Sequence, residues 1–124
     1  MLENFYSIIK QEVGSESASV QVRFNVAHPI FQGHFPAMPV VPGACMVQMV
    51  SELMSSVLQK KLQVVAVRNI KFLQLIYPET AGDVTFSMTW TEAAGGIATQ
   101  CQCLVHKEDT TYAIMKVTFS ESVF

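Results

Sequence analysis

The segment GACMVQMVSELMSSVLQKK, residues 43–61, decides how this chain of 124 residues folds. Projected at about 100° per residue, its apolar side chains cover most of a helix circumference and leave a narrow polar stripe. The apolar surface consists of Met46, Val47, Met49, Val50, Leu53, Met54 and Val57, and the stripe of Gln48, Ser51, Glu52, Ser55 and Gln59. Because such a helix is stable only when protein surrounds most of it, we expect one long helix at the centre of the fold.

Four segments after this helix have the composition of β-strands. They are QVVAVRNIKFLQLI (63–76), DVTFSMTWTE (83–92), IATQCQCLVHK (97–107) and YAIMKVTFS (112–120). In the second of them large apolar residues alternate with small polar ones, which is typical of a half-buried strand. The segments AAGG and EDT lie between the last three strands and are turn signals. The pattern therefore predicts antiparallel strands joined by short turns.

The residues before the long helix predict a short helix and one further strand. Phe5, Ile8 and Ile9 stand at helical spacing, which predicts an amphipathic helix over residues 2–11. The following GSES would end this helix. Strict alternation in SVQVRFNVA, residues 19–27, then predicts a half-buried strand.

This order of elements predicts the α+β class and a single domain over residues 1–124. One curled antiparallel sheet wrapped around the central helix satisfies the pattern. Such a sheet leaves two edges open. Half of the residues are hydrophobic, which exceeds the usual share in a soluble domain. We therefore expect a homodimer whose sheet continues across a two-fold axis, or a multiple of that dimer.

The composition argues against several classes of function. The net charge is -2 and the basic residues are scattered, which argues against nucleic acid as a partner. No apolar run approaches the roughly 20 residues of a membrane span, and the first residues lack the pattern of a signal peptide. The expected location is therefore the cytoplasm. Cys101 and Cys103 share one strand face without a second Cys/His pair at zinc spacing, so we expect buried free thiols and no metal.

The segment GHFPAMPVVPG, residues 33–43, combines one imidazole with three prolines just before the helix. The prolines fix φ and remove backbone donors, and Pro42 suits the first helical turn. The N–H of Gly43 then lacks a partner within the helix, and a helix start stabilises negative charge. Together with His34, it supplies two parts of a site that forms an enolate: a base with a pKa near neutrality and an oxyanion donor.

The same segment resembles the signature loop of the 3-hydroxyacyl-acyl-carrier-protein dehydratases of fatty-acid synthesis, a family with the hotdog fold. The matching residues are Gly33, His34, Phe35, Pro36, Pro39, Pro42 and Gly43. The similarity covers about residues 17–119, and IKFLQLIYPETAGD, residues 70–83, is similar to the strand and turn after the family's central helix. The resemblance implies a lyase that dehydrates a (3R)-3-hydroxyacyl chain on acyl carrier protein to the trans-2-enoyl thioester.

The resemblance also implies a role for each matched residue. His34 would remove the α-proton, and the N–H of Gly43 would polarise the thioester carbonyl. The family's acid, contributed by the other subunit, lies five residues after that glycine, where this chain has Gln48. An amide has no proton to donate at neutral pH, so we expect Gln48 to position a water or the substrate hydroxyl. Glu52, one turn of about 5.4 Å further along, is either a displaced acid or a solvated residue of the polar stripe.

Other candidates follow from the same resemblance. Phe31, Phe35 and Met38 would line an acyl tunnel, although core packing explains them equally well. Arg68 and Lys71 would receive an acidic carrier protein, although a solvated face is an equal alternative. No metal or organic cofactor is implied, because the phosphopantetheine arm arrives with the substrate.

Two other functions remain open on the sequence alone. One is a hotdog acyl thioesterase in which Gln48 positions water for attack on the thioester carbonyl. The other is a non-catalytic subunit that holds acyl chains or forms a heterodimer with an acid-bearing paralogue. Because the family's sites take the histidine from one chain and the acid from the other, such a heterodimer would have one complete site.

Overall fold

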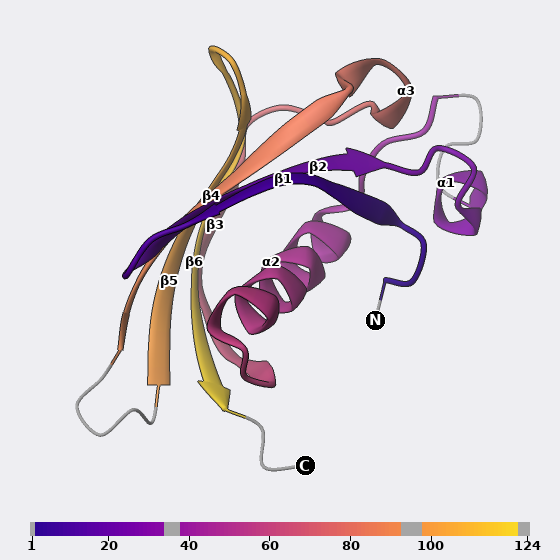
Figure 1. The fold of residues 1–124 in the computed structure, drawn as a ribbon. Helices are drawn as coiled ribbons and strands as arrows, with labels where there is room; N and C mark the ends of the chain where they lie inside the picture. The colour runs from indigo at the N-terminus through magenta and orange to yellow at the C-terminus, as the bar shows by residue number, and fades with distance from the viewer. Residues whose placement is uncertain (1, 34–37, 93–97, 122–124) are drawn as a thin grey trace.

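The computed structural model describes residues 2–33, 38–92 and 98–121, and it has one antiparallel sheet that curls around one long helix (Figure 1). The strands are β1 (Tyr6–Val13), β2 (Ser17–Phe24), β3 (Leu62–Phe72), β4 (Asp83–Glu92), β5 (Ala98–Lys107) and β6 (Thr110–Glu121). The helices are α1 (Pro29–Gly33), α2 (Gly43–Leu58) and α3 (Pro78–Ala81). The predicted α+β class and the central helix are confirmed.

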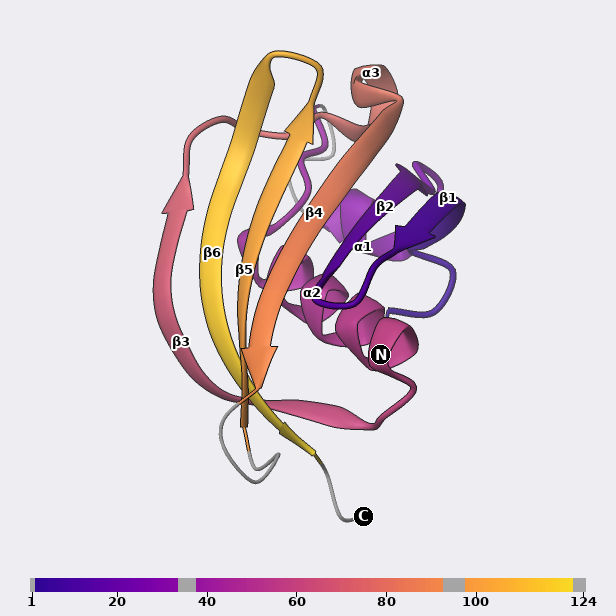
Figure 2. The ribbon, with the colours of Figure 1, turned by 60° about the vertical axis from the view of Figure 1, so that its left-hand side comes forward.

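The strand order in the sheet is β1-β2-β4-β5-β6-β3, and every neighbouring pair is antiparallel. Strands β1 and β3 therefore form its two edges, as Figure 2 shows on opposite sides of the molecule. Strand β3 reaches its edge by pairing with β6, far from it in sequence. The sheet is thus continuous but open at both ends.

The core lies between α2 and the concave face of the sheet. Alternate residues of the central strands point toward the helix and are buried: Val84, Phe86, Met88, Trp90, Cys101, Cys103, Val105, Met115, Val117 and Phe119. Met46, Met49, Val50, Leu53 and Met54 of α2 meet them. The cysteines at 101 and 103 are free and buried, as predicted. Burial raises the pKa of Cys101 to about 12.

The predicted N-terminal helix is wrong, because this segment forms strand β1. Tyr6 pairs with Phe24 and Val13 with Ala18 in an antiparallel hairpin with β2. The turn is closed by a 2.7 Å hydrogen bond from the Gly14 N–H to the Ser17 carbonyl. The register shifts between Ile8 and Lys10, so one extra residue interrupts the alternation. Because the extra residue, Ile9, breaks the alternation of the strand, Phe5, Ile8 and Ile9 stand at helical spacing in the sequence.

Three predicted boundaries also differ from the observed ones. Helix α2 ends at Leu58 rather than at residue 61, because Gln59 adopts a left-handed conformation with φ 53°. The strand predicted over residues 63–76 ends at Phe72, where the Leu73 N–H turns to bond the Tyr112 carbonyl. Strand β2 ends before Asn25, whose side-chain oxygen accepts from the N–H of Ala27 in a tight turn.

Candidate functional site

Helix α2 begins with an arrangement that leaves backbone donors available. Pro42 is the N-cap, with extended φ and ψ of -64° and 143°, and Gly43 is the first helical residue. The Pro42 carbonyl accepts from the N–H groups of Cys45 and Met46 at 3.0 and 3.2 Å. The N–H groups of Gly43 and Ala44 precede the first intrahelical bond and have no partner among the described residues. This end of α2 can therefore stabilise an oxyanion.

The ring of Phe72, at the end of β3, lies directly against Gly43. A Cβ atom at position 43 would be only 2.6 Å from the Phe72 Cζ. A larger residue at position 43 would therefore have to displace the ring of Phe72, so glycine is favoured here by close approach of a side chain. Phe72 is half exposed and forms one wall beside the start of the helix.

The loop leading to this helix start is described only in part. His34 and Phe35 lie outside the described residues, so the predictions for them are untested. The end of the loop is fixed by a 2.9 Å hydrogen bond from the Val41 N–H to the Ile76 carbonyl. Met38 is 64 % exposed and does not pack into the core. Phe31 is completely buried and stacks on Phe5 at 5.0 Å, so core packing accounts for it.

Gln48 and Glu52 lie one turn apart on α2 and are hydrogen-bonded to each other. The Gln48 Nε2 donates to the Glu52 Oε2 at 3.0 Å. Both side chains are partly buried. This i, i+4 contact brings the residue at the family's acid position together with the candidate displaced acid.

The expectation that Glu52 is merely solvated is wrong, because its carboxylate accepts two further hydrogen bonds. The Leu2 N–H donates to Oε2 at 2.9 Å, and the Tyr6 hydroxyl donates to Oε1 at 3.0 Å. Burial raises the pKa of Tyr6 well above its usual value, and the negative charge of Glu52 raises it further. The carboxylate therefore links β1 and the N-terminal segment to α2.

Sequence reasoning missed Tyr6 because it assigned this residue to a helix. The signal that would have found it is the GSES turn between two segments rich in β-branched residues, which is typical of a hairpin. A hairpin at this point pairs Tyr6 with the last residue of β2. From there the hydroxyl of Tyr6 reaches α2.

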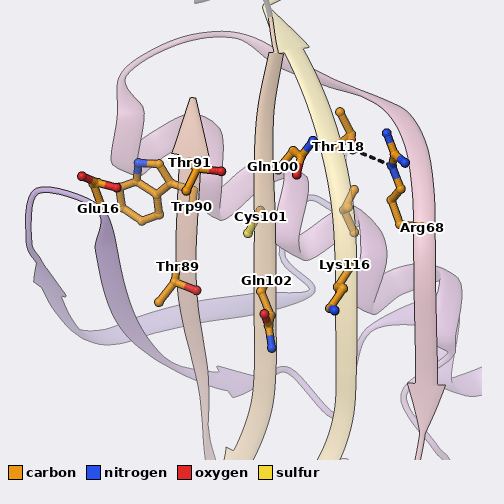
Figure 3. Close-up of a pocket in the computed structure, with 11 residues that line it drawn as sticks. Glu16, Arg68, Thr89, Trp90, Thr91, Gln100, Cys101, Gln102, Lys116 and Thr118 are labelled. Carbon is orange, nitrogen blue, oxygen red and sulfur yellow. Dashed lines mark hydrogen bonds between the residues drawn. The ribbon is translucent and has the colours of Figure 1, made fainter. Parts of the chain in front are cut away.

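Arg68 lies on the outer face of the sheet rather than near the start of α2. Its Nε donates to the Thr118 Oγ1 at 3.5 Å, along the dashed line in Figure 3. It lines a groove of about 500 Å³ together with Lys116, Glu16 and uncharged residues of β4, β5 and β6. Neither Gly43 nor Gln48 contributes to this groove. Lys71, the other proposed carrier contact, is exposed near the end of β3.

The described part of the chain has neither a cluster of metal ligands nor a membrane-spanning helix. Within residues 2–33, 38–92 and 98–121, no group of three or more His, Cys, Asp or Glu side chains is placed to hold a metal ion. Across those ranges there is also no helix of the length and hydropathy needed to cross a membrane.

The fold is shared with several solved structures. The dehydratase heterocomplex ApeI:P from Xenorhabdus doucetiae superposes with a TM-score of 0.69 at 19% identity, covering 93% of this chain and 97% of that one. The PaaI protein of E. coli, from the phenylacetic acid degradation operon, has a TM-score of 0.63 at 15% identity, covering 94% of this chain and 79% of that one. These likenesses establish the hotdog fold.

Sequence comparison gives a narrower assignment. The 3-hydroxyacyl-[acyl-carrier-protein] dehydratases FabZ of Rickettsia massiliae and Rickettsia felis are each 36% identical over 61 residues, covering 43% of this chain. The match spans 42% of the length of these curated relatives. The family model of the ApeI dehydratase matches residues 10–116, which is most of the chain. By that match, the chain belongs to the ApeI-like dehydratase family.

Proposed function

We propose that this protein dehydrates a (3R)-3-hydroxyacyl thioester, carried by acyl carrier protein, to the trans-2-enoyl thioester. The observation that carries the proposal is the start of α2, where the Gly43 N–H is left for an oxyanion directly after the His34 loop. Membership of the ApeI-like dehydratase family supports the same reaction. The phosphopantetheine arm comes with the substrate, and no other cofactor takes part.

The proposed reaction needs one base and one oxyanion donor. The imidazole of His34 removes the α-proton while the Gly43 N–H stabilises negative charge on the thioester oxygen. The electron pair of the broken C–H bond forms the Cα=Cβ bond, and the bond from Cβ to oxygen breaks. The departing hydroxide takes the proton from the imidazolium and leaves as water. His34 thus returns to its neutral form.

Gln48 makes this site differ from the family's usual arrangement. The amide cannot protonate the leaving hydroxyl, so His34 must serve as both base and acid. We expect turnover to be slower than with a carboxylic acid at this position, because general acid catalysis typically contributes about 10²–10⁴-fold. A role for Glu52 as a displaced acid remains a prediction. Its carboxylate already accepts hydrogen bonds from three protein donors, which counts against that role.

The proposed assembly is a homodimer, or a multiple of it, joined through the free edge of β3. Val64, Val65 and Val67 lie in its middle and are 37 to 53 % exposed. A long apolar edge strand with unpaired backbone groups is a template for pairing. A second copy of β3 across a two-fold axis would continue the sheet and bring α2 of one subunit near the loop of the other.

A second candidate is a subunit that completes its site only with an acid-bearing paralogue. It is favoured by the hydrogen bond that ties Gln48 to Glu52, since this arrangement offers no acid to the reaction. The solved structure from Xenorhabdus doucetiae is itself a dehydratase heterocomplex. In this case the chain alone binds acyl chains but does not dehydrate them.

The decisive experiment incubates the purified protein with a (3R)-3-hydroxyacyl carrier-protein thioester and follows the products by mass spectrometry. Enoyl product that disappears in the folded His34→Ala variant supports the proposal. Free acid would instead indicate a thioesterase. Neither product, together with enoyl formation after addition of an acid-bearing paralogue, would indicate the second candidate.

A paired substitution tests the role of Gln48 more sharply than a single one. Gln48→Glu alone would place two carboxylates four residues apart, so the partner position must change with it. The swap Gln48→Glu with Glu52→Gln places an acid at the family's acid position and an amide one turn later. We expect it to raise turnover and to add an alkaline limb to a pH profile that otherwise rises to a plateau. Loss of activity in the swap, and in Glu52→Gln alone, would mean that Glu52 is the acid.

A further inference from the structure

The hydrogen bonds around Glu52 join three parts of the chain, and the proposed reaction does not use them. Oε2 accepts from the backbone N–H of Leu2 and from the amide of Gln48, and Oε1 accepts from the hydroxyl of Tyr6. All three distances lie between 2.9 and 3.0 Å. Glu52 is therefore held from two other elements, and Gln48 is held by Glu52.

This arrangement decides which end of the Gln48 amide faces Glu52. A carboxylate that accepts from a backbone N–H can only accept, so the group facing it must be the NH₂. With the amide reversed, Gln48 Oε1 would lie about 3.0 Å from a carboxylate oxygen, which is repulsive. Because the two ends of a planar amide point in different directions, the carbonyl oxygen is turned away from Glu52.

The carbonyl oxygen of Gln48 is therefore the end that is free to meet another molecule. No described residue donates a hydrogen bond to it. A carbonyl oxygen accepts hydrogen bonds and cannot donate them. A substrate group opposite it is recognised only if that group is a donor.

We propose that Glu52 and Tyr6 are positioning residues that hold Gln48 with its carbonyl oxygen toward the acyl chain, so that the site selects a chain with a hydroxyl on its β-carbon. This inference rests on the proposed function, which places Gln48 beside that hydroxyl. An enoyl or saturated chain has no donor at the same atom. One such hydrogen bond corresponds to about tenfold in affinity.

Tyr6 contributes by holding Glu52 in place rather than by touching the substrate. Removing its hydroxyl leaves Glu52 with two of its three donors. Tyr6→Phe should therefore loosen Gln48 less than Glu52→Ala does. Tyr112 is also partly buried against the core, and Tyr112→Phe is the matched control.

The test measures binding without turnover. Pantetheine is linked through a stable amide to a (3R)-3-hydroxyoctanoyl chain or to an octanoyl chain, and both are titrated by calorimetry. The parent protein and Tyr112→Phe should bind the hydroxylated chain about tenfold more tightly. Glu52→Ala and Gln48→Ala should bind both chains equally, and Tyr6→Phe should lie between. In ¹⁵N NMR spectra, the Gln48 side-chain amide should show slow proton exchange that Glu52→Ala abolishes.

The outcomes separate this inference from the proposed reaction. A hydroxyl preference that depends on Glu52, in a protein without enoyl product, supports the inference and overturns the reaction. Enoyl formation with a preference that survives Glu52→Ala overturns the inference and leaves the reaction standing. Equal binding of the two chains by the parent protein, or no binding of either, also overturns it.

Discussion

The two edges of the sheet, β1 and β3, occupy equivalent positions but have different chemistry. Strand β1 carries an exposed Lys10–Glu12 ion pair at 3.2 Å, which disfavours pairing with another strand, whereas register shifts interrupt both edges. Strand β3 has the uncharged run Val64–Val65–Ala66–Val67 in its middle. The difference supports the proposal that β3, rather than β1, pairs with a second copy of the chain.

The edges also differ in how they connect to α2. Strand β1 reaches the middle of the helix through a polar contact, the hydrogen bond from Tyr6 to Glu52. Strand β3 reaches the start of the helix through an apolar one, the ring of Phe72 against Gly43. The hydrogen bond from Tyr6 holds the Glu52 side chain in place, whereas the Phe72 ring lies beside the backbone N–H groups at the start of α2. The two edges therefore control different parts of the candidate site.

The largest effect should come from charging the β3 edge. Val65→Lys with Val67→Lys should convert the proposed dimer into a monomer in light scattering at micromolar concentration and lower turnover, since Gln48 would then no longer lie near the loop of the other subunit. The stability of the single chain should change little, because both side chains are about half exposed. Ile8→Lys with Ile9→Lys on β1 is the matched control and should leave the proposed dimer intact. Equal effects at the two edges would remove the distinction between them.

A smaller effect is expected from Gly43→Ala, where the new Cβ meets Phe72. Overpacking in a close-packed core typically costs about 1–3 kcal/mol in free energy of unfolding, and a half-exposed Phe72 places this contact at the low end of that range. We expect a loss in that range in urea titrations, with reduced turnover as the helix start shifts. Adding Phe72→Ala should recover part of the stability, and the double-mutant cycle measures the contact. Simple additivity would show that the ring does not press on position 43.

The hydrogen bond from Tyr6 of β1 to Glu52 should affect the free energy of unfolding at alkaline pH. The folded-state pKa of Tyr6 is raised above the ordinary value of about 10, chiefly by burial, so the unfolded chain loses this proton first. The stabilisation of the folded state by the protonated Tyr6 hydroxyl is complete below about pH 10. It is lost as the pH rises above that value, because ionisation then favours the unfolded state. Tyr6→Phe should flatten the fall in unfolding free energy above pH 10. It should cost about 1 kcal/mol at pH 7. A parallel fall in both proteins would contradict the assignment.

The smallest effect is expected at the centre of the sheet, between the two edges. Burial raises the pKa of all three thiols, but Cys45 is only partly buried whereas Cys101 and Cys103 lie in the core. A disulfide reagent at pH 8 should therefore modify one thiol in the folded protein and three in denaturant. Modification of Cys103 without denaturant would show that the sheet opens in its middle rather than at its edges.

Much of this architecture was predictable because its signals are periodic and uninterrupted. The apolar girth of α2 and the alternation in β4 identified the helix and the strand bounds Asp83–Glu92. Strand β1 was not predictable in the same way, because its bulge breaks the alternation. Helix α2 ends early because Gln59 takes a left-handed conformation, which glycine rather than glutamine usually signals.

The candidate site was predictable where it follows from local sequence, and not where it depends on long-range contacts. Pro42 and Gly43 at the start of α2 allowed its unpaired backbone N–H groups to be predicted. Two of the three donors to Glu52, Tyr6 and Leu2, are 46 and 50 residues away, so no local pattern reports them. The contact of Phe72 with Gly43 likewise depends on how β3 crosses the helix start. The site thus combines features set by local sequence with contacts that only the tertiary fold brings together.

The bond between Gln48 and Glu52 has a consequence for the history of this chain. A chain with the acid at position 48 and the amide at position 52 needs two substitutions to reach the present order. It must pass through a protein with two amides or with two carboxylates at these positions. Two carboxylates would repel each other beside the partly buried Tyr6, whereas two amides can still form a hydrogen bond with each other. The intermediate with two amides is therefore the more stable of the two, and we expect relatives of this chain to include that pair.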